Sequence, residues 1–206
     1  IAISSVTASS HILSECLSKF AQQYPDIVVD ISFTSGREQA VDLSSDKYDF
    51  HFALRDMIPA GSSFEFIESH VDNLCLILPP GHPLANQGVD FSKLKDEKFI
   101  IASELDSPAL YEQVMNICEA NNYKPKIVNR YDRAEGVILS VSAGLGISIV
   151  PKSLCEVFGA SKVEILPLEG PDTKRSHVIA WHRESIKPAV RLFRDVVIEM
   201  FGGKVS

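Results

Sequence analysis

The feature that most constrains this chain is the alternation of strand and helix patterns in its first quarter. Residues 1–4, 27–33 and 48–54 have strand patterns, and residues 27–33 alternate apolar with polar side chains. A helical rhythm of apolar residues follows the first strand pattern, and residues 37–45 carry a second one. Strands and helices in this order build an open parallel sheet with right-handed crossovers.

The pattern continues to the end of the chain and indicates two lobes. Further strands are predicted at residues 64–70, 73–78, 98–102, 126–131, 147–150, 163–168 and 177–181, and further helices at residues 107–121, 132–143, 153–158 and 188–201. Asp132 and Glu135 have the spacing of a capping box. We expect an α/β fold of two Rossmann-like lobes, residues 1–72 plus 177–206 and residues 73–176. Two crossover strands join them, with a cleft between.

Composition excludes several classes of protein. The 206 residues include 20 Lys and Arg against 27 Asp and Glu, a formal charge of −7, so the chain offers no basic surface for DNA. It contains no apolar run long enough to span a membrane and no signal-peptide pattern. Because Ile1 is not a methionine, either a signal peptide has been removed or the chain is a domain of a longer protein.

The four cysteines, Cys16, Cys75, Cys118 and Cys155, form no CxxC pair and match no zinc spacing. Each has apolar neighbours, so we expect free, buried thiols of a kind that favours a reducing cytoplasm. No nucleophile–base arrangement, phosphate loop or HExxH motif occurs. We therefore expect no catalytic residue, no metal and no cofactor.

Four motifs in order and spacing resemble one known family. They are Phe20 to Asp26 at the end of the first helix, DFHFALR at residues 49–55, LPPGHPLA at residues 78–85 and VSAGLGISIVP at residues 141–151. Together the motifs resemble the effector-binding domain of LysR-type transcriptional regulators, and the match covers essentially the whole chain.

The resemblance implies a type 2 periplasmic-binding-protein-like fold that binds a small inducer between its lobes. It implies a cytoplasmic homodimer or homotetramer that contacts DNA only through an N-terminal winged helix-turn-helix domain absent from this chain. We expect residues 27–33 and the first helix to form the dimer face, pairing antiparallel with the other lobe of a second subunit. Redox-sensing members use two cysteines about nine residues apart; Ala109 precedes Cys118 at that spacing, so sensing of peroxide by that route is disfavoured.

Ligands of open α/β sheets bind beyond the carboxyl ends of strands, near helix N-termini. Hydroxyl groups and helix N-termini there suit a carboxylate. The predicted effector-binding residues are Ser5, Thr7, Ser9, Ser35, Gly36, Arg55, Ser103, Ser107 and Arg133.

Some of these positions also have a structural interpretation. A serine of the first loop could simply cap the following helix, and Arg55 could pair with Asp56 at the surface. Glu104 and Asp106 disfavour a strongly anionic ligand and leave room for a zwitterion such as an amino acid.

Two other functions share the predicted fold. One is an extracytoplasmic solute-binding protein of a transporter, which the four cysteines and the LPPGHPLA motif disfavour. The other is a small enzyme, which lacks an acid–base pair here. The sequence favours an effector-sensing domain of a transcription regulator.

Overall fold

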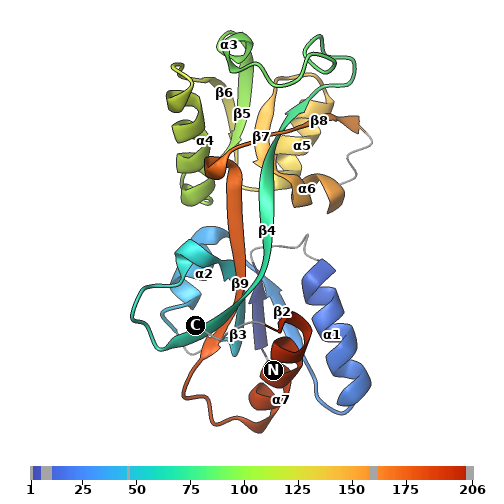
Figure 1. Ribbon diagram of the computed structural model, residues 1–206, viewed down its shortest axis with the longest axis vertical. Helices are drawn as coiled ribbons and strands as arrows, with labels where there is room; N and C mark the ends of the chain where they lie inside the picture. The colour runs from blue at the N-terminus through green and yellow to red at the C-terminus, as the bar shows by residue number, and fades with distance from the viewer. Residues whose placement is uncertain (1, 6–10, 46, 158–161, 203–206) are drawn as a thin grey trace. The chain divides into compact units, whose positions relative to one another are not determined.

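The chain forms two compact units (Figure 1). The structure is a computed structural model that describes residues 2–5, 11–45, 47–157 and 162–202. Unit 1 comprises Ile1–Val71 and Ser176–Ser206, and unit 2 comprises Asp72–Arg175. The cleft that the sequence predicts between two lobes stays a prediction.

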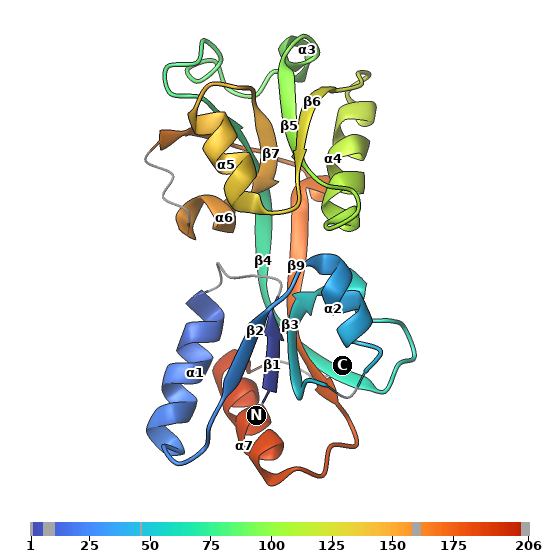
Figure 2. The ribbon, with the colours of Figure 1, turned by 180° about the vertical axis from the view of Figure 1, so that it is seen from behind.

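Unit 1 is built on a parallel sheet, as the alternation of patterns predicts. Strand β1 (Ala2–Ser5) lies between β2 (Asp30–Phe33) and β3 (Phe50–Leu54), and both pairings are parallel (Figure 2). Strand β9 (Lys174–His182) then returns antiparallel beside β3. The β-α-β-α-β order expected for the first quarter of the chain is therefore confirmed.

Helices cover the sheet of unit 1 because their apolar faces match the alternating faces of the strands. The helices are α1 (His11–Gln23), α2 (Gly36–Asp42) and α7 (Pro188–Phe201). The apolar positions predicted on α1 face the core, where Cys16 and Phe20 are almost completely buried. The ring of Phe20 packs against that of Phe193 of α7, with ring centroids 5.0 Å apart. Phe50 of β3 packs into the same cluster. Several buried aromatic rings contribute large apolar surfaces to this cluster.

Unit 2 combines antiparallel strands with a two-stranded parallel sheet, and helices pack on both faces of these strands. Its strands are β5 (Lys98–Ala102), β6 (Lys126–Tyr131), β7 (Ser148–Pro151) and β8 (Glu164–Pro167), together with the second half of β4 (Phe64–Leu78). Strands β5 and β6 are parallel, whereas β7 and β8 run antiparallel to β4. Its helices are α3 (Phe91–Leu94), α4 (Pro108–Ala120), α5 (Ala134–Ser142) and α6 (Lys152–Val157). Short 3₁₀ turns lie at Arg55–Met57 in unit 1 and at Pro171–Thr173 in unit 2.

The GLG segment of the last quoted motif has two distinct structural roles. Gly144 has φ +77° and ends α5, which confirms the predicted glycine termination of that helix. Gly146 has no room for a side chain, because a Cβ there would overlap the carbonyl oxygen of Lys98. Ile147 follows and exchanges backbone hydrogen bonds with β5, donating to Lys98 and accepting from Ile100.

Two predicted details are wrong. Residues 64–70 and 73–78 form the single strand β4, in which the turn-favouring residue Asp72 stays extended and its carboxylate accepts hydrogen bonds from Ser153. The Asp132–Glu135 capping box does not form, because α5 begins at Ala134 with Arg133 as its N-cap. Parallel pairing with β5 keeps β6 extended to Tyr131, and Arg133 is still extended at φ −124° and ψ 143°.

Within the part of the chain that the structure describes, no helix has the length and apolar character needed to cross a membrane.

His51 of β3 is an ionisable side chain inside the core of unit 1. Its side chain is fully buried, with the rings of Tyr48 and Phe64 at centroid distances of 6.0 and 5.4 Å. Burial lowers the pKa of His51 to about 4, and the positive charge of His182 acts in the same direction.

This pKa makes the stability of the fold depend on pH. The unfolded chain binds a proton near the ordinary pKa of 6.5 and the folded chain only near 4, so His51 favours unfolding as pH falls between these values. We expect the free energy of unfolding in urea to fall by on the order of 3 kcal/mol from this group between pH 7 and pH 4. In the variant His51→Leu, the free energy of unfolding should fall less between pH 7 and pH 4, by that same amount. Equal pH dependence in the two proteins would contradict the assignment.

Candidate functional site

The carboxyl ends of the three parallel strands of unit 1 lie at one edge of its sheet. Ser5 is in register with Phe33 of β2 and with Phe52 of β3, so the carboxyl ends of these strands lie side by side (Figure 2). This places Ser5, Ser35 and Gly36 at the same edge, with Arg55 one residue after β3. Thr7 and Ser9, the other predicted residues of this edge, lie outside the described residues.

Ser35 is the N-cap of α2 and forms a capping box with Glu38, a motif that the sequence predicted only at Asp132 and Glu135. Its Oγ accepts from the backbone N–H of Glu38 at 3.2 Å, and Glu38 Oε2 accepts from the backbone N–H of Ser35 at 2.7 Å. Gly36 is the first residue of the helix. The hydroxyl of Ser35 still has its proton to donate, so capping and ligand contact are compatible.

Thr34 is a polar side chain of this edge that was not among the predicted binding residues. Its Oγ1 is buried and has no hydrogen-bond partner among the described residues. A buried hydroxyl without a partner is unfavourable, and a ligand or a water molecule would relieve it. In the sequence, only the position of Thr34 between the second strand and Ser35 indicated that its hydroxyl could lie at this edge.

Arg55 does not make the surface pair with Asp56 that the sequence left open. Its guanidinium carbon lies 4.3 Å from the ring centroid of Phe66, and Nη1 donates to the carbonyl oxygen of Ile58 at 3.5 Å. The guanidinium is thus held in position by an aromatic face. An oriented guanidinium loses less freedom when it binds an anion.

Unit 2 has a similar edge where the parallel strands β5 and β6 end. Ala102 is in register with Tyr131, and the backbone N–H of Ser103 donates to the carbonyl oxygen of Tyr131 at 2.8 Å. Ser107 and Arg133 are the N-caps of α4 and α5, and neither uses its side chain to cap its helix. Both helices therefore begin at this edge with their N-terminal N–H groups and partial positive charge.

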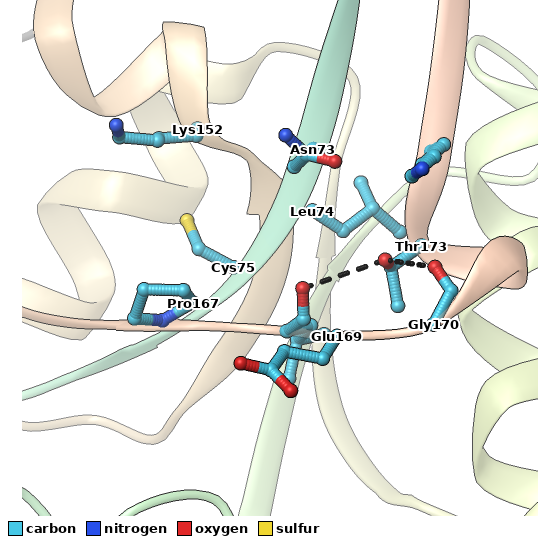
Figure 3. Close-up of a pocket in the computed structure, with 10 residues that line it drawn as sticks. Asn73, Leu74, Cys75, Lys152, Pro167, Glu169, Gly170 and Thr173 are labelled. Atoms are coloured by element: carbon cyan, nitrogen blue, oxygen red, sulfur yellow. Dashed lines mark hydrogen bonds between the residues drawn. The ribbon is translucent and has the colours of Figure 1, made fainter.

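A separate shallow cavity of about 340 Å³ lies in unit 2 (Figure 3). Its lining residues are Asn73, Leu74, Cys75, Lys152, Pro167, Leu168, Glu169, Gly170, Thr173 and Lys174. Thr173 Oγ1 donates within the wall of the cavity, to the carbonyl oxygens of Gly170 at 2.8 Å and Leu168 at 3.4 Å. No predicted site residue lines this cavity, and no local motif in the sequence indicates it.

The cysteines of the structure match the expectation of free thiols. Cys16, Cys75, Cys118 and Cys155 are all unbridged and buried. Among the described residues, His, Cys, Asp and Glu side chains form no group of three or more that could hold a metal ion.

Comparisons with known proteins agree with this architecture. A family model described as the LysR substrate binding domain matches residues 1–202. The uncharacterised HTH-type transcriptional regulator YnfL of Escherichia coli K12 is 29% identical over 185 residues, which cover 88% of this chain and 61% of that protein. The chain thus spans about three fifths of the length of the curated relatives it matches.

Solved structures show the same fold at low sequence identity. The effector-binding domain of QuiR in complex with shikimate has a TM-score of 0.82 at 22% identity, covering 98% of this chain and 96% of that one. The regulatory domain of CcmR from Synechocystis PCC6803 in complex with 2-PG has a TM-score of 0.81 at 19% identity, with the same coverage. The predicted α/β fold of the type 2 periplasmic-binding-protein kind is confirmed.

The capping role of Ser35 can be separated from any role in binding. Ser35→Ala removes the oxygen that accepts from Glu38, and we expect unfolding in urea to become easier by about 1 kcal/mol. Ser35→Asp supplies another good N-cap oxygen and should restore most of that stability. If the Ser35→Ala variant were as stable as the unaltered chain, the capping box would contribute nothing measurable to the free energy of unfolding.

Proposed function

This chain belongs to the LysR substrate-binding domain family, and we propose that it binds a small organic effector for a DNA-binding transcription regulator. The observation that carries the proposal is the family match over residues 1–202. The effector-bound domains of similar fold support it, since they hold shikimate and 2-PG.

We propose that the effector carries a carboxylate or another acid group. The predicted residues of unit 1 offer hydroxyl groups and the oriented guanidinium of Arg55, and Thr34 adds a buried hydroxyl. Those of unit 2 offer the N-termini of α4 and α5. Exposed Glu104 beside the start of α4 would suit the ammonium group of a zwitterion.

The remaining proposals concern the whole protein. We propose that it contacts DNA through a winged helix-turn-helix domain outside this chain, as the HTH-type name of YnfL suggests, and that it acts in the cytoplasm. We propose no catalytic activity for it. The alternative of an extracytoplasmic solute-binding protein is not favoured, because the family and the curated relatives are transcriptional regulators.

We propose that the chain assembles as a homodimer or homotetramer through β2 and α1. Strand β2 is the edge strand of unit 1, and Ile31 and Phe33 on it are 40% and 62% exposed. Ile27 and Val29 point to the same face of the extended segment as Ile31 and Phe33, and they pack against the core that α1 covers. The exposed side chains of Ile31 and Phe33 therefore extend an apolar face beside α1. On unit 2 of a second copy, β6 and α5 offer exposed Val128 and Leu139.

Calorimetry against amino acids, aromatic acids and sugar acids tests effector binding. We expect at least one acid to bind, and Thr7→Ala to weaken it roughly tenfold or more by removing a hydrogen bond to a charged group. Exposed Ser18→Ala on α1 is the control and should bind as the unaltered chain does. Full binding by Thr7→Ala would remove the serine- and threonine-rich loop from the site.

Ser35→Asp gives a second arm to this test. The aspartate caps α2, so folding is retained, but its negative charge should repel an acid group at the strand edge. Loss of binding with unchanged stability supports an anionic effector. Unchanged binding would place the acid group elsewhere.

Sedimentation velocity tests the dimer face. Phe33→Asp places a charge on the exposed edge of β2, and we expect it to shift the chain towards the monomer. Val41→Asp, 64% exposed on α2 away from this face, should leave the dimer intact. An unaltered chain that stays monomeric at high concentration would contradict the proposed face.

A further inference from the structure

Two cysteines that are far apart in the sequence place their sulfurs against each other in unit 2. Cys75 Sγ of β4 and Cys155 Sγ of α6 are 3.8 Å apart, and both side chains are fully buried. They belong to one apolar cluster with Ile77 and Val150. The other two cysteines are separate, since Cys16 lies in unit 1 and Cys118 pairs with the hydroxyl of Tyr123 at 3.3 Å.

The distance between the sulfurs suits formation of a bond. A disulfide joins its sulfurs at about 2.05 Å, so the pair must approach by roughly 1.8 Å. Cys75 is fixed in the middle of the sheet, because β4 is paired there with Val150 of β7 on one side and Pro167 of β8 on the other. Cys155 lies on the six-residue helix α6, so the approach requires a movement of one short element.

The contact between the two sulfurs favours Cys155 as the thiolate of the pair. The thiol of Cys75 lies between the carbonyl oxygen of Val150 at 3.5 Å and the sulfur of Cys155. The interaction between the two sulfurs lowers the pKa of Cys155, although burial opposes this, whereas the same interaction and burial both raise the pKa of Cys75. Asp72 opposes ionisation of both thiols and Glu156 opposes that of Cys155, whereas Lys152 favours ionisation of Cys75.

The two isolated cysteines have no such partner thiol. Burial raises the pKa of Cys16 to about 12, and it also raises the pKa of Cys118. Thiols that stay protonated react slowly with oxidants.

The cavity of unit 2 reaches one member of the pair. Cys75 and Lys152 both line it, as Figure 3 shows. Lys152 and Cys155 are three residues apart on α6, so they lie on the same face of the helix. The cavity wall thus includes Cys75 and, through Lys152, the face of α6 that carries Cys155, whereas Cys155 itself is fully buried and does not line the cavity.

We propose that Cys75 and Cys155 are a modification site at which hydrogen peroxide or a small organic hydroperoxide forms a disulfide. The Cys155 thiolate attacks one peroxide oxygen, the O–O bond breaks, and the leaving oxygen takes up a proton as water or alcohol. The Cys75 sulfur then attacks the sulfur of the Cys155 sulfenic acid. The S–S bond forms, the S–O bond breaks, and water leaves with the proton of Cys75. The two sulfurs together lose two electrons to the peroxide.

This pair differs from the nine-residue cysteine spacing considered for the family, and the proposal does not depend on effector binding. Peroxide treatment of the folded chain, thiol counting after denaturation and peptide mapping test it directly. We expect free thiols to fall from four to two, with one peptide linkage between Cys75 and Cys155, and dithiothreitol to restore all four. The mapping uses the unaltered chain, so it does not rely on a variant that folds poorly.

Matched variants complete the test. Cys75→Ala and Cys155→Ala should each form no disulfide within the chain, whereas Cys16→Ala and Cys118→Ala should form it as the unaltered chain does. All four substitutions remove a buried thiol, so a general loss of packing would affect the variants of Cys75 and Cys155 and the control variants of Cys16 and Cys118 alike. The proposal is overturned if the folded chain keeps four thiols, if Cys155 oxidises without forming a link, or if the link involves Cys16, Cys118 or a second chain.

Discussion

The parallel pairing of neighbouring strands is the constraint on which the rest of this structure depends. Parallel strands bring all their carboxyl ends to one edge, so the loops that follow them meet there even when they are far apart in the chain. In unit 1 this applies to β1, β2 and β3, and in unit 2 to β5 and β6. Each parallel pair is followed by a helix that starts at the same edge, which concentrates hydroxyl groups and helix N-termini there. The proposed effector contacts all follow from this arrangement.

Close backbone approach is the second requirement of the fold. Unit 2 joins its parallel pair to the antiparallel strands through Ile147, and this junction is possible because Gly146 has no side chain to meet the carbonyl of Lys98. The glycine motif that contributed to the family resemblance is thus a requirement of sheet assembly. The same sheet fixes Cys75 in its centre, opposite a short helix. Sheet formation therefore positions both the strand-end loops and the thiol pair of this unit.

Most elements were predictable from the sequence, because local periodicity determines which face of a strand or helix is apolar. The helix at Pro188–Phe201 was predicted with the bounds that it has in the structure. Errors occurred where a long-range pairing overrides a local signal. The capping box predicted at Asp132 does not form, because pairing with β5 keeps β6 extended up to Tyr131. Strand β4 is continuous where the sequence predicted a break between two strands. The capping box at Ser35 was equally visible in the sequence, but it competes with no strand pairing and forms.

The sequence by itself determined the alternation of strands and helices, the apolar faces, the positions of the hydroxyl-rich strand ends and the resemblance to LysR effector-binding domains. All of these are properties of residues close together in the chain. Only the tertiary structure decided that Arg55 lies over Phe66, that Thr34 has a buried hydroxyl without a described partner, and that Cys75 meets Cys155. Such contacts join side chains from different elements, and their distances depend on the packing of the whole unit, which no local pattern contains.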